Sequence, residues 1–133
     1  MQKTFQAVVF GKAGCDKCQV LRRRLEAVLA EPEWADFEQA YFDVDTVEGL
    51  VEFCRMECLN PQRLPALVVR RLTPAEPVPV EVDPARVADP ILGTARLYHL
   101  AGLQTDYGPA GRGVVTREMI RSALAMARAA AAP

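Results

Sequence analysis

The start of the fold is decided by residues 7–18, whose sequence is AVVFGKAGCDKC. Its apolar run predicts a buried strand from Thr4 to Phe10. After the second cysteine, apolar residues recur at helical intervals and arginines occupy the other face, which predicts an amphipathic helix from Asp16 to about Ala30. The two cysteines therefore stand where a strand passes into a helix. The expected inward positions of this helix are Cys18, Leu21, Leu25, Val28 and Leu29.

Cys15 lies at the N-terminus of the predicted helix, and Cys18 follows one turn later. Unpaired backbone N–H groups and the positive end of the helix dipole favour the thiolate form of a cysteine at that place. Lys12 and Lys17 also favour the thiolate electrostatically, whereas Asp16 opposes it. The pair is thus a candidate redox dithiol, close enough to form a disulfide. The alternative is that both cysteines only pack against their neighbours.

Composition is that of a globular protein. The chain has 133 residues, 50% of them apolar and 25% charged, and we expect residues 1–133 to form one domain. A net charge of −1 argues against a nucleic-acid partner. We expect Arg22 to Arg24 to be a solvated helix face, with a docking patch for an acidic partner as the alternative. Neither a secretory signal nor a membrane span is visible, so we expect a cytoplasmic protein that does not bind membranes.

Periodicity predicts further elements along the chain. Strands are expected at residues 37–44, 66–72 and 96–101. A second helix is expected to start at Asp45, because Glu48 completes a pair that resembles a capping box. The last helix is expected to start at Thr116, a good N-cap. The inward face of the second helix is predicted to comprise Val47, Leu50, Val51, Cys54 and Cys58.

A proline-rich segment, residues 73–94, separates the third and fourth predicted strands. It holds five of the ten prolines of the chain. Proline lacks the N–H that a central strand donates, so we expect an extended surface excursion with an edge strand around residues 78–82.

The predicted order β-α-β-α-β-β-α, with CxxC at the first strand–helix junction, resembles the thioredoxin-like fold in its short, glutaredoxin-type form. The resemblance covers the chain except for the proline-rich insertion. It implies an α/β fold with a mixed four-stranded sheet flanked by helices. Leu64-Pro65 matches the cis-proline loop that faces the dithiol in this family. The resemblance further implies that Cys15 attacks, that Cys18 resolves, and that Leu64 and Pro65 offer backbone groups to the substrate.

The sequence also departs from the family pattern. Thioredoxins carry Trp before the first cysteine and Gly-Pro between the pair, where this chain has Gly14 and Asp16-Lys17. Val9 occupies the position of their buried acid, so proton transfer at Cys18 needs water or another group. The glutathione-binding pattern of glutaredoxins is not clearly matched. Glycines at other spacings lie in that area and could place Arg112 near an anion, but we favour a flexible connector; they are Gly108, Gly111 and Gly113.

These features predict a thiol–disulfide oxidoreductase that acts on protein disulfides without a cofactor. Its reductant is a thiol that the sequence does not identify, with glutathione as one candidate. One alternative is a non-catalytic thioredoxin-like module that binds proteins. Another is a metal–thiolate protein with zinc or an iron–sulfur cluster. Its four ligands would be Cys15, Cys18, Cys54 and Cys58.

Three other assignments follow from the residue types. We expect Cys54 and Cys58 to be reduced, metal-free core residues, because cysteine is often a small buried hydrophobe. His99, the only histidine, is expected to pack on an edge strand rather than to catalyse. Trp34 and Tyr107 are expected to cover loops.

Overall fold

The computed structural model describes residues 3–57, 59–86 and 89–131. Its elements are β1 (Phe5–Gly11), α1 (Asp16–Leu29), β2 (Phe37–Asp43), α2 (Val47–Arg55), β3 (Ala66–Arg71), β4 (Val78–Pro79), β5 (Gly102–Gln104) and α3 (Arg117–Ala131), with short 3-10 turns at Pro32–Trp34 and Gly93–Ala95. In this part of the chain the strands form one mixed sheet in the order β2-β1-β3-β4, with β5 also paired to β3. β1 and β2 are parallel, and β3 is antiparallel to its three partners. None of the helices described is long and apolar enough to cross a membrane.

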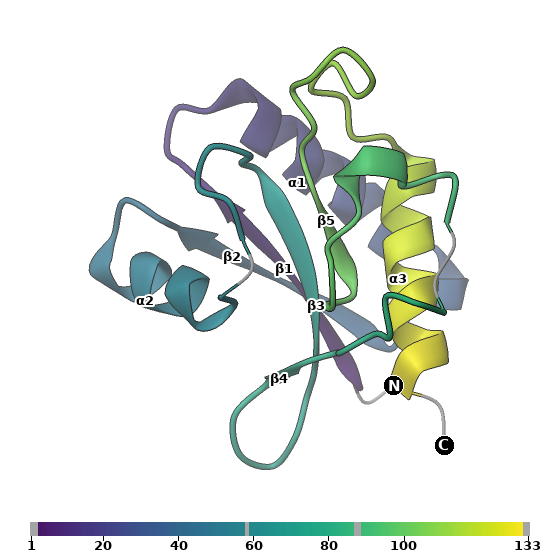
Figure 1. The fold of residues 1–133 in the computed structure, drawn as a ribbon. Coiled ribbons are helices and arrows are strands. Elements are labelled where there is room, and N and C mark those ends of the chain that lie inside the picture. The colour runs from purple at the N-terminus through teal and green to yellow at the C-terminus, as the bar shows by residue number, and fades with distance from the viewer. Residues whose placement is uncertain (1–2, 58, 87–88, 132–133) are drawn as a thin grey trace.

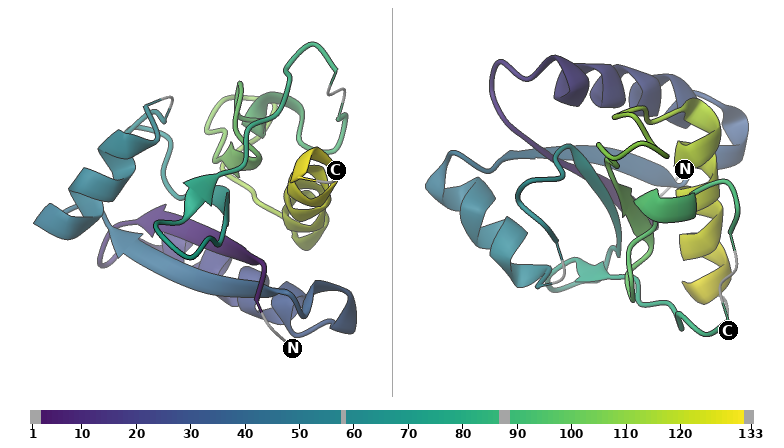
Figure 2. Two further views of the ribbon diagram at one scale, coloured as in Figure 1. Left: turned by 90° about the horizontal axis from the view of Figure 1, so that it is seen from below. Right: turned by 45° about the horizontal axis from the view of Figure 1, so that its top comes forward.

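Two helices cover one face of the sheet and one helix covers the other (Figures 1 and 2). Ala7 and Val9 of β1 point to the α1–α3 side, whereas Val8 and Phe10 point to the α2 side. The apolar run of β1 is continuous because this central strand is buried on both faces. On α1 the predicted inward residues Cys18, Leu21, Leu25 and Val28 are buried, as the periodicity indicated.

The predicted inward face of α2 is wrong. Val47, Leu50, Val51 and Cys54 are exposed, and the buried positions are Gly49, Phe53 and Met56. Cys58 lies outside the described residues, so its predicted burial stays a prediction. The N-cap of the helix also lies one residue later than the expected Asp45. Its N-cap is Thr46, whose Oγ1 accepts a hydrogen bond from the N–H of Gly49 at 3.0 Å.

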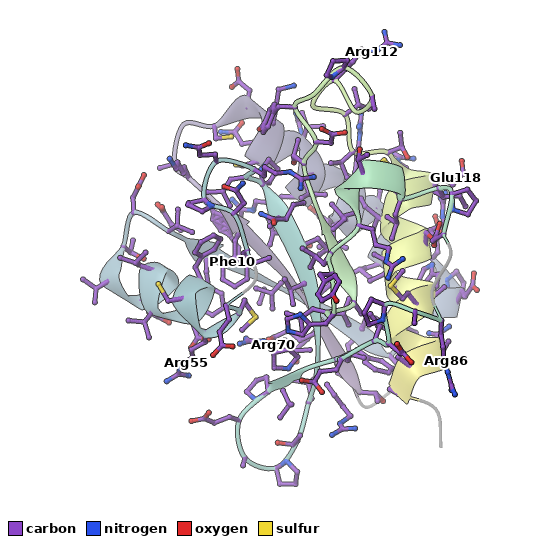
Figure 3. The ribbon with its side chains drawn as sticks, in the orientation of Figure 1. Phe10, Arg55, Arg70, Arg86, Arg112 and Glu118 are labelled. Atoms are coloured by element: carbon purple, nitrogen blue, oxygen red, sulfur yellow. The ribbon has the colours of Figure 1, made fainter. Side chains whose placement is uncertain are left out.

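Close packing explains which face of α2 turns inward. A Cβ on Gly49 would lie 1.8 Å from the carbonyl oxygen of Asp43, so only glycine permits this approach to the end of β2. The Phe53 ring packs edge-on against Phe10, with centroids 5.5 Å apart. Arg70 of β3, which is buried and labelled in Figure 3, pairs with Glu52 at 3.1 Å. A close backbone contact, an aromatic contact and an ion pair with the buried Arg70 thus hold helix α2 against the sheet.

The predicted four-stranded sheet gains a fifth strand, and the strand predicted at residues 96–101 is misplaced. The regular strand is Gly102–Gln104, and the preceding residues make only isolated bridges. β4 lies inside the proline-rich segment. That segment is not only a surface excursion, because Val80 and Val82 are buried in the main core and the N–H of Val80 donates to the carbonyl of Val69 at 3.0 Å. In residues 78–83 each valine is followed by a proline or an acidic residue, so Val80 and Val82 can point into the core while their neighbours face solvent.

Candidate active site

The dithiol lies at the junction of β1 and α1. The N–H of Cys15 donates to the carbonyl of Lys12 at 3.3 Å, which closes a turn. Gly14 has a φ of 75°, in the left-handed region that glycine adopts without strain. Cys15 is the N-cap of α1, since its Sγ accepts a hydrogen bond from the N–H of Cys18 at 3.3 Å. The strand–helix junction predicted from the sequence therefore positions both sulfurs.

The two sulfurs differ in exposure and protonation. Cys18 is 1% exposed, whereas Cys15 is partly open to solvent. The Cys18 thiol donates to Cys15 Sγ at 2.7 Å. Burial, and then the hydrogen bond to Cys15, raise the pKa of Cys18 to about 12. Cys18 is therefore a protonated thiol at neutral pH, and Cys15 is the sulfur of the pair that solvent can reach.

The Leu64–Pro65 peptide bond is cis, as the family resemblance implied. It directly precedes β3. The Pro65 carbonyl accepts hydrogen bonds from the Oγ1 and the N–H of Thr105, at 2.7 and 3.2 Å. The hydroxyl of Tyr107 donates to the Leu64 carbonyl. A cavity of about 200 Å³ beside α1 brings Pro65 together with Lys17 and Arg24.

The loop after β5 packs against α1 through Lys17. Its Nζ donates to the carbonyl of Gly113 at 3.2 Å and lies 5.6 Å from the centre of the Tyr107 ring. Asp106 closes the loop, because its carbonyl accepts from the N–H of Gly113 at 2.6 Å. These bonds make the loop internally braced rather than the flexible connector that we predicted. Arg112, which the sequence placed near a possible anion, points away from the protein at the tip of the loop (Figure 3). Lys12 and Asp16, predicted with Lys17 to affect the charge state of Cys15, are exposed.

Tyr41 also belongs to this site, although the sequence analysis missed it. β1 and β2 pair in parallel with Val9 opposite Tyr41, so the tyrosine points to the α1 side of the sheet. The Arg22 guanidinium lies 4.0 Å from the centre of its ring. A Cβ on Gly11 would lie 2.9 Å from Cys18 Sγ and 3.5 Å from Tyr41 Oη. The strand pattern of residues 37–43 was the only sequence feature that bore on the position of Tyr41, and it does not specify which strand these residues pair with.

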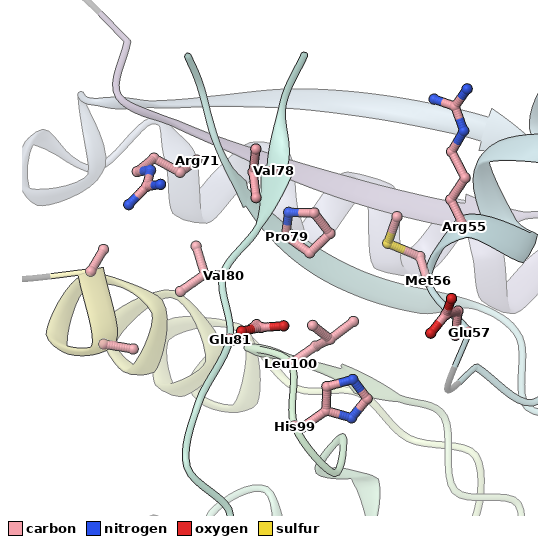
Figure 4. A pocket seen from close by; sticks show the side chains of 12 residues that line it. Arg55, Met56, Glu57, Arg71, Val78, Pro79, Val80, Glu81, His99 and Leu100 are labelled. Atoms are coloured by element: carbon pink, nitrogen blue, oxygen red, sulfur yellow. The ribbon is translucent and has the colours of Figure 1, made fainter. Parts of the chain in front are cut away.

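The remaining candidates lie elsewhere. Cys54 is exposed on α2, and among the described residues no group of three or more His, Cys, Asp or Glu side chains could hold a metal ion. His99 is half-buried and lines a groove of about 520 Å³ near β4 (Figure 4). Cys15, Cys18 and Pro65 are not among its lining residues. The groove also includes Arg55, Met56, Pro79 and Leu100.

Comparison with solved structures identifies the fold. The chain matches the crystal structure of chloroplastic thioredoxin z with a TM-score of 0.52 and 20% identity, over 96% of this chain and 80% of that chain. Mitochondrial thioredoxin 3 from Saccharomyces cerevisiae, in its oxidised form, matches with a TM-score of 0.39 and 15% identity, over 57% of this chain and 69% of that chain. No protein-family model matches the chain, and no curated protein does. The protein has the thioredoxin-like fold, so the predicted fold class is confirmed.

The exposure difference predicts an order of alkylation. In the reduced, folded protein, iodoacetamide near neutral pH should label Cys15 and Cys54 within the time in which Cys18 stays unlabelled, because Cys18 is buried and protonated. Trypsin cleaves after Lys17 and so separates Cys15 from Cys18 for mass spectrometry. Unfolding in denaturant should make Cys18 react as fast as the others. Equal labelling of Cys18 and Cys54 in the folded protein would contradict the described burial.

Proposed function

We propose that the protein is a thiol–disulfide oxidoreductase that reduces protein disulfides through Cys15 and Cys18. The observation that carries this proposal is the asymmetric pair at the N-terminus of α1, an accessible sulfur at Cys15 with the buried, protonated thiol of Cys18 2.7 Å behind it. Thiol–disulfide exchange needs an accessible attacking sulfur and a second thiol that releases the mixed disulfide. The thioredoxin-like fold supports the same assignment.

The reaction proceeds in two exchanges. The Cys15 thiolate attacks one sulfur of the substrate disulfide, and the other substrate sulfur leaves as the first thiol. Cys18 then attacks Cys15 Sγ, which releases the second substrate thiol and leaves a disulfide between Cys15 and Cys18. A separate thiol reductant restores the pair. In this proposal Leu64 and Pro65 contact the substrate backbone, and Lys12, Asp16 and Lys17 set the electrostatic potential around Cys15.

The cytoplasm is the compartment that we propose. Cys54 is a free cysteine on the surface of α2, and exposed free thiols are kept reduced in the cytosol by glutathione and thioredoxin systems. Fractionation of cells that express the protein, with detection by antibody, tests this assignment. Recovery in an oxidising compartment would contradict it.

Insulin reduction tests the proposed activity. The protein, added in catalytic amount to insulin and dithiothreitol, should accelerate the precipitation of the free B chain over dithiothreitol alone. A matched sample treated with iodoacetamide, which blocks Cys15 together with the exposed Cys54, serves as the control and should not accelerate it. Equal rates with and without the protein would contradict the oxidoreductase proposal and favour the protein-binding module, for which the exposed Val47, Leu50 and Val51 of α2 offer an apolar surface.

A further inference from the structure

In the second exchange, here called the resolving exchange, Cys18 must lose its proton before it attacks Cys15 Sγ. Only the thiolate is an effective nucleophile, yet this sulfur is buried and protonated. Once Cys15 is bonded to a substrate sulfur, its Sγ is part of a disulfide and is a weaker acceptor for the Cys18 thiol. Val9, beneath the dithiol in β1, is fully buried and apolar, and has no group that could assist. Rapid turnover therefore needs another polar group beside Cys18 Sγ.

The geometry supplies one such group in Tyr41. Cys18 Sγ and Tyr41 Oη approach the same point, 2.9 and 3.5 Å from where a Cβ on Gly11 would lie. Because Gly11 has no side chain, this space is left to the sulfur and the hydroxyl. The two groups make no direct hydrogen bond in the structure, so a small movement of the tyrosine or one bridging water would join them. The Tyr41 ring is held in place by Arg22, one helical turn after Cys18, at 4.0 Å.

The surrounding groups leave Tyr41 as a neutral donor. Burial, and then the negative charge of Asp43, raise the pKa of Tyr41, and a Cys18 thiolate would raise it further, so the hydroxyl keeps its proton at neutral pH. The other titratable or charged groups that face the pair are Cys15 and Arg22 of α1 and Asp43 of β2, with Tyr107 beyond the dithiol and the backbone of Lys12 beside it. A neutral hydroxyl stabilises a forming thiolate without adding a competing charge.

We propose that Tyr41 stabilises the Cys18 thiolate in the resolving exchange, by donating a hydrogen bond to Sγ directly or through one water. This inference rests on the proposed function. Cys18 Sγ bonds to Cys15 Sγ, and the bond between Cys15 and the substrate sulfur breaks with its electron pair on the substrate. The Cys18 proton passes to that leaving sulfur. The dithiol is oxidised by two electrons and the substrate disulfide is reduced by two, with no other reagent.

Stopped-flow reaction with 5,5′-dithiobis(2-nitrobenzoate) separates the two exchanges. The parent protein for this test carries Cys54→Ala and Cys58→Ala, so that only the dithiol releases the coloured thiol. Attack by Cys15 releases the first equivalent in a bimolecular phase, and attack by Cys18 releases the second in a unimolecular phase. Tyr41→Phe should slow the second phase about tenfold at neutral pH, the factor that one hydrogen bond to a charged group provides. It should also move the pH midpoint of that phase upward and leave the first phase unchanged.

Matched variants make the test specific. Tyr98→Phe, at a tyrosine that is 72% exposed, should change neither phase. A second phase of Tyr41→Phe with the parent rate and pH profile overturns the proposal, as does equal slowing of both phases, which indicates a structural role. Slowing by Asp43→Asn in place of Tyr41→Phe overturns it in favour of the carboxylate. Failure of the proposed function looks different, because the parent protein then shows no second release.

Discussion

Cys15→Ser is expected to reduce the rate of insulin reduction by on the order of a thousandfold or more, to the rate without protein. A serine hydroxyl remains neutral near pH 7 and is a far weaker nucleophile towards sulfur than a thiolate. Cys18→Ser should act differently. Its Cys15 can still attack, but no thiol lies behind it to release the product, so a mixed disulfide with the substrate should accumulate.

Non-reducing electrophoresis and mass spectrometry distinguish the two variants. Cys18→Ser should appear as a covalent adduct with an insulin chain that dithiothreitol removes, whereas Cys15→Ser should show none. Cys54→Ser, at an exposed cysteine on α2, is the matched control and should retain the parent rate. Adduct formation by Cys15→Ser but not by Cys18→Ser would reverse the assigned roles.

Phe53→Ala is expected to lower the free energy of unfolding by about 3 kcal/mol, since it removes a ring that packs on Phe10 in the core beneath α2. Leu50→Ala, at a more exposed position of the same helix, should change it by no more than about 0.5 kcal/mol. Leu50 is 51% exposed, whereas Phe53 is 7% exposed. Both variants lose a comparable apolar side chain and gain alanine, so the helix propensity changes little.

Urea unfolding followed by circular dichroism measures both free energies. The comparison decides which face of α2 is buried, because the sequence analysis placed Leu50 inside and the structure places Phe53 there. A larger loss for Leu50→Ala than for Phe53→Ala would restore the face predicted from the sequence and contradict the described packing.

Local signals were sufficient for α1 and for the dithiol. Three features mark this junction: a continuous apolar run, the turn that Gly14 permits, and the helical spacing of Cys18, Leu21 and Leu25. Each involves only residues close together in the sequence, so the sequence predicted the junction correctly. The N-cap at Thr116 is similar, because its Oγ1 accepts from the N–H of Met119 only three residues away, at 3.1 Å. Such features depend on neighbours in sequence and need no knowledge of the fold.

The orientation of α2 was not contained in its own sequence. Apolar residues lie on both faces of this helix, Val47, Leu50 and Val51 on one and Phe53 and Met56 on the other, so periodicity alone favoured the more populated face. Contacts with residues outside the helix decide which face of α2 is buried. Gly49 allows contact with the end of β2, and Arg70 of β3 attracts Glu52.

The sequence by itself determined the dithiol, its place at the start of a helix and the α/β class, because each follows from short-range periodicity, capping or a motif. The cis-proline position was implied by the family resemblance. Only the tertiary structure decided that Tyr41 stands beside Cys18. Residues 41 and 18 are brought together by the parallel pairing of β1 with β2 and by the packing of α1 on that pair. Strand pairing is a long-range choice among several possible partners, and no local pattern in residues 37–43 specifies it.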